Sequence, residues 1–121
     1  SRATDILLAL SPLDVGQGAV VAAGLCLGIE TLQGTDALLK FVADTPDTLR
    51  RAKGGVLVKA PKRGQDLRVD MPAIGPDTVH NAAAAGLDGI VVSAGKVLLL
   101  DRALTLEALK ETGLFLIGRV L

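Results

Sequence analysis

The sequence is poor in aromatic residues, cysteine and histidine. Two Phe residues are its whole aromatic content, so a core must be built from Leu, Val, Ile and Ala. A single cysteine, Cys26, excludes an internal disulfide and is typical of a reducing compartment. The apolar neighbours of Cys26 predict a buried, unreactive thiol. Because His80 is the only histidine and is expected at the surface, we expect no metal site made of Cys and His ligands.

An excess of charge of either sign is also absent. The 13 basic and 13 acidic residues balance, so no overall field would attract nucleic acid, and an anion would have to be bound by a local cluster. The longest apolar stretch, residues 19–29, contains glycines and is shorter than the roughly 20 residues of a membrane-spanning helix. The chain starts without an initiator Met and without a secretory signal, and we expect that an upstream segment is missing.

The spacing of apolar residues predicts alternating helices and strands. Helical spacing is found at residues 4–10, 37–42, 78–85 and 104–110, the last with Leu106 and Leu109 facing inward. Strand-like runs occupy residues 19–22, 25–29, 56–58, 89–92, 97–100 and 114–118, the first two as a hairpin. A turn or short helix is expected at residues 46–51, with Arg50 and Arg51 in solvent. The predicted fold is a single α/β domain with a mixed sheet flanked by helices.

Charged and apolar residues alternate in the stretch that follows the strand at residues 56–58. If residues 66–71 are extended, Asp66, Arg68 and Asp70 share one face. The two carboxylates would then be roughly 13 Å apart at Cα, so a bend near Gly64 or Pro72 is needed before both can hold one divalent cation. The alternative interpretation is a solvated face with weak ion pairs.

A second candidate lies at the start of the helix at residues 37–42. Thr35 or Asp36 has an ordinary explanation as the residue that caps this helix. A helix N-terminus also binds phosphate, although Asp36 would repel a phosphate unless a cation lay between them. Both explanations stay open on the sequence alone.

Several short segments, taken in order, resemble the LpxI family of bacterial UDP-2,3-diacylglucosamine pyrophosphatases. They are Asp14-Val15-Gly16-Gln17, Gly34-Thr35-Asp36, Lys59-Ala60-Pro61-Lys62, Gln65-Asp66-Leu67-Arg68-Val69-Asp70, Pro72 and Ile74-Gly75. The most specific is the Gln-Asp-x-Arg-x-Asp run after two lysines. The chain departs from the family at Gln33, where Glu is frequent, and at Arg63, where Pro is frequent.

The resemblance implies an enzyme that needs Mg²⁺ or another divalent cation. It would cleave the pyrophosphate of UDP-2,3-diacylglucosamine to UMP and 2,3-diacylglucosamine 1-phosphate (lipid X) in lipid A biosynthesis. Residues 1–121 would be the C-terminal catalytic domain of a two-domain protein whose N-terminal domain is absent from this chain. The expected location is the cytoplasm, with peripheral contact at the inner membrane, and a homodimer is a further hypothesis.

The resemblance also gives roles to individual residues. Asp66, Asp70 and Arg68 are the catalytic candidates, and Asp66 and Asp70, with Asp36 and Asp14 in second rank, are the candidate metal ligands. The candidate substrate-binding residues are Lys59, Lys62, Gln65, Gln17 and Thr35. Three alternatives remain: a non-catalytic module that binds a nucleotide sugar or lipid headgroup, a structural domain, and a pyrophosphate hydrolase for a smaller nucleotide.

Overall fold

The structure, a computed structural model, describes residues 2–13, 16–50, 54–61 and 71–120. Its helices are α1 (Arg2–Leu10), the 3-10 helix η1 (Ser11–Leu13), α2 (Thr35–Ala43), α3 (Pro76–Ala84) and α4 (Arg102–Thr112). Its strands are β1 (Gly18–Ala22), β2 (Leu25–Ile29), β3 (Val56–Lys59), β4 (Ala73–Ile74), β5 (Gly89–Ser93), β6 (Leu98–Leu99) and β7 (Phe115–Arg119).

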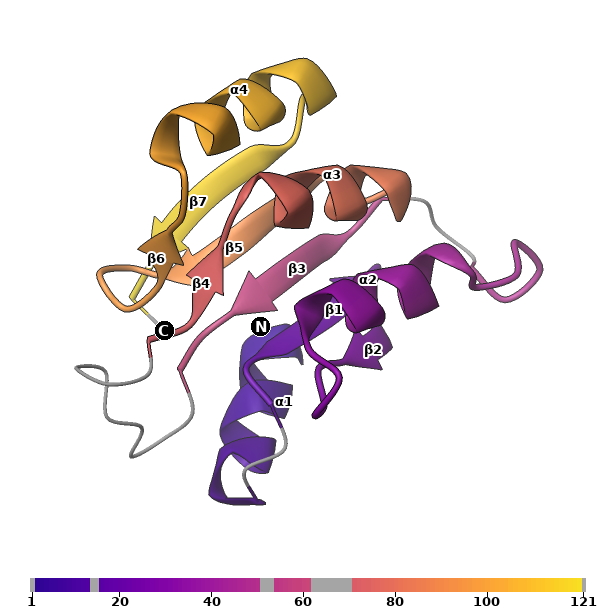
Figure 1. The fold of residues 1–121 in the computed structure, drawn as a ribbon. Coiled ribbons are helices and arrows are strands. Elements are labelled where there is room, and N and C mark those ends of the chain that lie inside the picture. Colours follow the sequence, from indigo (N-terminus) through magenta and orange to yellow (C-terminus); the bar gives the residue numbers. More distant parts are fainter. Residues whose placement is uncertain (1, 14–15, 51–53, 62–70, 121) are drawn as a thin grey trace.

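The main sheet is mixed, which confirms the predicted fold class. Its strand order is β2-β1-β3-β5-β7 (Figure 1). β1 lies antiparallel to both β2 and β3, whereas β3, β5 and β7 run parallel to one another. The three parallel strands therefore end at the same edge of the sheet, which we call the carboxyl edge. The strand predicted at residues 97–100 is only β6, and it pairs with β4 in a separate two-stranded sheet.

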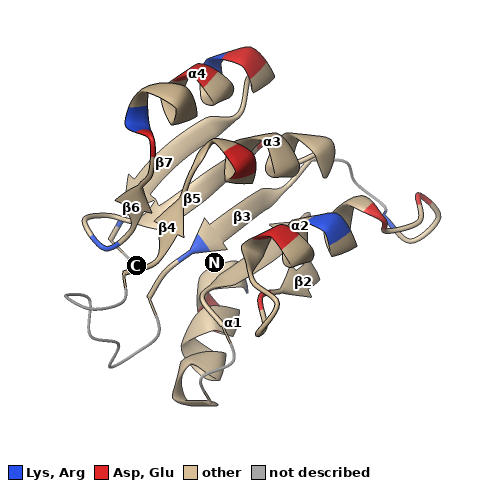
Figure 2. Ribbon diagram, in the orientation of Figure 1, with Lys and Arg blue, Asp and Glu red and all other residues tan. Residues whose placement is uncertain are grey.

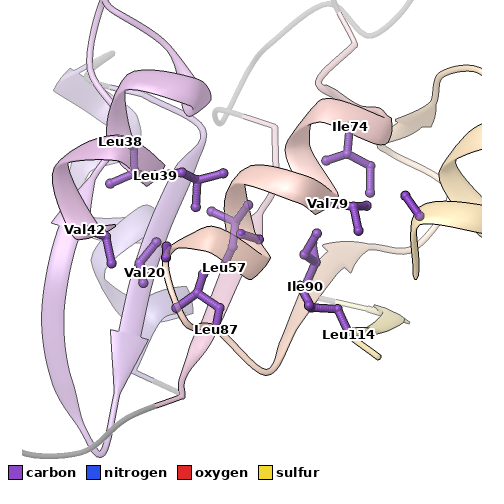
Figure 3. Close-up of a cluster of buried hydrophobic side chains, with 13 residues drawn as sticks. Val20, Leu38, Leu39, Val42, Leu57, Ile74, Val79, Leu87, Ile90 and Leu114 are labelled. Carbon is purple, nitrogen blue, oxygen red and sulfur yellow. The ribbon is translucent and has the colours of Figure 1, made fainter. Parts of the chain in front are cut away.

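Two apolar clusters cover the two faces of the sheet. Side chains alternate between faces along each strand, so Leu57 and Val58 of β3 belong to different clusters. The larger cluster packs the sheet against α2, α3 and α4, and the smaller one packs it against α1 (Figures 1 and 3). Members of the larger cluster include Val20, Leu38, Leu39, Val42, Leu57, Ile74, Val79, Leu87, Ile90 and Leu114. No helix in the described part of the chain is long and apolar enough to cross a membrane.

Two predictions about individual apolar side chains were wrong. Leu106 of α4 is 47% exposed, because the buried stripe of this helix runs through Thr105 and Ala108, with Leu109 packed beside it. Cys26 is exposed, because its strand β2 is at the edge of the sheet. The spacing of leucines in one case and the apolar run in the other suggested burial, but the position of the element in the fold decided the exposure.

Arg50 is half-buried, which corrects the prediction that it is solvated. Its guanidinium donates to the carbonyl of Ala85 (2.5 Å), just after α3, and to that of Gly54 (2.9 Å). Arg50 thus links Gly54, just before β3, to the end of α3. The same prediction was made for Arg51, which lies outside the described residues.

Replacing Arg50 by Met is expected to lower the free energy of unfolding by about 2–3 kcal/mol. Met keeps an apolar stem but leaves both carbonyls without the charged donor. Urea unfolding of the 121-residue chain would measure the change. Lys96→Met, at an exposed turn, is the matched control and should stay within about 0.5 kcal/mol of the wild type. Equal stability of the two variants would contradict the role given to Arg50.

Candidate functional site

A buried charged cluster lies at the carboxyl edge, where β3 ends in Lys59. The amide of the next residue, Ala60, donates to the carbonyl of Gln17 (2.9 Å), so the chain before β1 runs beside the end of β3. In Figure 2 the end of β3 is basic and the beginning of α2 is acidic. The edge therefore brings together the end of β3, the entry to β1 and the first turn of α2.

Glu30 is the centre of this cluster. Its Oε1 accepts hydrogen bonds from Lys59 Nζ (3.3 Å) and from the hydroxyl of Thr35, and its Oε2 accepts one from the backbone N–H of Gln17 (2.8 Å). Lys59 Nζ also donates to Thr35 Oγ1 (2.7 Å). Glu30 and Lys59 are 7% and 3% exposed, so the ion pair is almost completely out of solvent. We call these four residues the Glu30 cluster.

Small residues before β1 allow this close packing. The amide of Glu30 donates to the carbonyl of Gly18 (2.8 Å), which ties the end of β2 to the start of β1. A Cβ built on Gly16 would lie 2.0 Å from the backbone oxygen of Glu30, a distance that no side chain can accept. Glycine at position 16 is therefore needed for the chain to pass over Glu30.

The first turn of α2 contributes the hydroxyl of Thr35. The N-cap of this helix is Gly34, without a side-chain cap, so the prediction that Thr35 or Asp36 caps it was wrong. The Thr35 hydroxyl instead bonds to Glu30, and Asp36 Oδ1 accepts a hydrogen bond from Asn81 Nδ2 of α3 (3.1 Å). Both polar side chains thus have tertiary rather than local partners.

One N–H donor of the Glu30 cluster could bind an anion. The pair of Glu30 and Lys59 has no net charge, and burying such a pair costs desolvation that its attraction only partly returns. Lys59 has three N–H donors, and the acceptors recorded for it are Glu30 and Thr35. One N–H of the ammonium therefore has no acceptor within the described part of the chain, at an edge where α2 also begins. A phosphate oxygen would satisfy it.

The comparison with known proteins decides the family. The model of the LpxI C-terminal domain matches residues 1–117. The chain belongs to the LpxI C-terminal domain family. A curated relative, the UDP-2,3-diacylglucosamine pyrophosphatase LpxI of Caulobacter vibrioides, is 50% identical over 120 residues, which are 97% of this chain and 43% of the relative. The chain therefore spans less than half the length of this LpxI protein, and the resemblance seen in the sequence is confirmed.

The structure brings together three of the residues that the LpxI resemblance singled out. Lys59 and Thr35 bond to each other and to Glu30, and Gln17 joins them through its backbone N–H. Asp36 follows Thr35 but is bonded to α3. The other candidates lie outside the described residues: Asp14, Lys62, Gln65, Asp66, Arg68 and Asp70. Within residues 2–13, 16–50, 54–61 and 71–120, no group of three or more His, Cys, Asp or Glu side chains could hold a metal ion.

Glu30 is the residue that sequence reasoning missed. Its one signal was a single acidic residue directly after the apolar run Leu25–Ile29. Burial of the carboxylate could not be inferred from that position, because it depends on Lys59 being brought beside it.

An apolar groove lies between β2 and α2, beside residues that flank Glu30 and Thr35 in the chain. It has a volume of about 380 Å³ and is lined by residues of β2, the following loop and α2, among them Ile29, Gly34, Leu38 and Phe41. Phe41, which is 66% exposed, offers a large apolar surface in this groove. The groove and the polar cluster are thus neighbours at the first turn of α2.

Proposed function

We propose that this chain provides part of the active site of a pyrophosphatase that hydrolyses UDP-2,3-diacylglucosamine to UMP and 2,3-diacylglucosamine 1-phosphate in lipid A biosynthesis. The observation that carries the proposal is 50% identity to the Caulobacter vibrioides enzyme along 97% of the chain. The Glu30 cluster supports it, because it offers hydrogen-bond donors at a helix N-terminus for a phosphate group. The adjacent apolar groove is consistent with an acylated substrate.

In this proposal the chain's own donors orient and stabilise the pyrophosphate. Lys59 would donate to the substrate the N–H that is not bonded to Glu30 or Thr35. Thr35 and Gln17 would fix the geometry around the ammonium. Lys62, Gln65 and Arg68 are proposed as further substrate contacts. Negative charge that develops on the leaving phosphate is best stabilised by donors already held in place.

We further propose that Mg²⁺ or another divalent cation is required, with Asp66 and Asp70 as ligands and Asp36 as an additional one. Among the described carboxylates, Asp36 fits this task, because it is exposed and only Oδ1 is bonded, to Asn81. Glu30 does not fit, because both its oxygens accept hydrogen bonds and an ammonium already lies beside it. Bound Mg²⁺ would offset charge on the pyrophosphate oxygens.

The proposal extends to the rest of the protein. We propose that an upstream domain completes the active site, since the relative is more than twice as long as the matched segment. Because the proposed substrate is diacylated, we propose that the enzyme acts in the cytoplasm, at the surface of the inner membrane. Homodimer formation is a separate hypothesis for this domain.

Turnover of UDP-2,3-diacylglucosamine tests the function directly. We expect the full-length protein to release UMP with Mg²⁺ present, and a chelator to abolish the release. The 121-residue chain alone is expected to be inactive, because the upstream domain is missing. Binding of the substrate without release of UMP would favour a non-catalytic module. Faster hydrolysis of a smaller nucleotide pyrophosphate would assign a different substrate.

A further inference from the structure

The carboxylate of Glu30 lies in a site that only an ionised, acceptor-only group can fill. Oε2 faces the backbone N–H of Gln17, and Oε1 faces the ammonium of Lys59 and the hydroxyl of Thr35. An amide in the same place would have to direct its NH₂ group either at the Gln17 N–H or at the ammonium. Either orientation sets a donor against a donor.

Glu30 also determines where its neighbours lie. A lysine side chain has a flexible four-carbon stem, so its ammonium can occupy many positions unless it is held. Here two N–H groups of the ammonium donate hydrogen bonds to Glu30 and Thr35, and the Thr35 hydroxyl donates one to Glu30. These three bonds form a closed ring, which fixes the direction of the remaining N–H.

We infer that Glu30 is a positioning residue for the proposed hydrolysis: it holds the Lys59 ammonium and the Thr35 hydroxyl where the pyrophosphate is bound. This inference rests on the proposed function. Glu30 itself does not contact substrate, because both of its oxygens are occupied by protein donors and it is buried. Its contribution is orientation, for which small displacements cost much of the rate.

The test is Glu30→Gln in the full-length protein, with kcat and KM for UMP release measured on folded enzyme. We expect kcat/KM to fall about 100-fold, mainly through kcat, because the displaced donors are lost from the transition state. The matched control is Asp88→Asn, since the Asp88 carboxylate accepts the N–H of Gly55 (3.1 Å) near the opposite end of β3. This control loses the same charge and should keep kcat/KM at the wild-type value.

Two further variants extend the test, and the first of them replaces Glu30→Gln if that variant folds poorly. Glu30→Asp retains the charge but withdraws the carboxylate by one methylene, and it should also lower kcat/KM. The double variant Glu30→Gln/Lys59→Met should have the same kcat/KM as Glu30→Gln alone, because Lys59 is already misplaced in the single variant. A further large loss in the double variant would show that Lys59 works without Glu30 and would overturn the inference.

The outcomes separate this inference from the proposed function. Wild-type turnover together with unchanged kcat/KM in Glu30→Gln or Glu30→Asp overturns the role of Glu30 and leaves the hydrolase proposal in place. Absence of turnover in the wild-type full-length protein contradicts the hydrolase proposal itself. If Asp88→Asn lowered kcat/KM as much as Glu30→Gln, the effect would come from a general loss of stability, and the positioning role would be overturned.

Discussion

Replacing Asp66 or Asp70 by Ala in the full-length protein is expected to lower kcat by roughly 10²–10⁴-fold, the range found when a positioned catalytic group is removed. The reason is the pattern of hard oxygen ligands beside Arg68, in a segment that follows the end of β3 and precedes β4. Carboxylates of this kind suit Mg²⁺ and the activation of water. Release of UMP under saturating substrate is the measurement.

A carboxylate with no proposed role serves as the control. Glu107 is exposed on α4, and Glu107→Ala is expected to leave kcat unchanged. Raising the Mg²⁺ concentration should partly restore the kcat of a variant that has lost one metal ligand but retains the other. It should not restore a variant that has lost a catalytic base. If Asp66→Ala and Asp70→Ala both turned over substrate at the wild-type rate, the alternating charges would be a solvated face.

Lys59→Met is expected to lower the free energy of unfolding by about 3–5 kcal/mol, because it leaves the buried carboxylate of Glu30 without its cation. Such a loss is a large fraction of the stability of a small domain. Urea unfolding of the 121-residue chain would measure it. No comparable loss is expected for Lys40→Met, since Lys40 is exposed on α2.

The double variant Lys59→Met/Glu30→Gln should recover much of this stability. Without the ammonium, the amide oxygen of a Gln at position 30 can accept the Gln17 N–H while its NH₂ donates to the Thr35 hydroxyl. Removing both charges also removes the desolvation cost of the pair. Recovery of stability without recovery of turnover would separate the structural contribution of the pair from its contribution to catalysis. A Lys59→Met variant as stable as the wild type would contradict a buried, ionised Glu30.

Local sequence signals predicted most of the elements, because each depends on residues close in the chain. The hairpin of β1 and β2 follows from two β-rich runs, and the helix predicted at residues 78–85 is α3, which begins at Pro76. The exposure of Cys26 could not be predicted, because nothing in its apolar run shows that β2 is at the edge. The separate pairing of β6 with β4 is likewise a property of the assembled fold.

The candidate site was predictable only where a family motif covered it. Lys59, Thr35 and Gln17 were identified by resemblance, and the structure places them together. Glu30 was not, because two of its partners, Gln17 and Lys59, are 13 and 29 residues away in the chain and no local pattern links them. The assignments of Asp66, Arg68 and Asp70 stay predictions, since these residues lie outside those that the structure describes.

The chain separation within the Glu30 cluster also has a consequence for folding kinetics. The hairpin of β1 and β2 can form locally, whereas Lys59 is 29 residues from Glu30 and α2 lies between them in the chain. Contacts of such separation carry a loop-closure cost and form after local ones. We expect both charges to stay hydrated until the two residues meet, so that neither carboxylate nor ammonium is buried alone during folding.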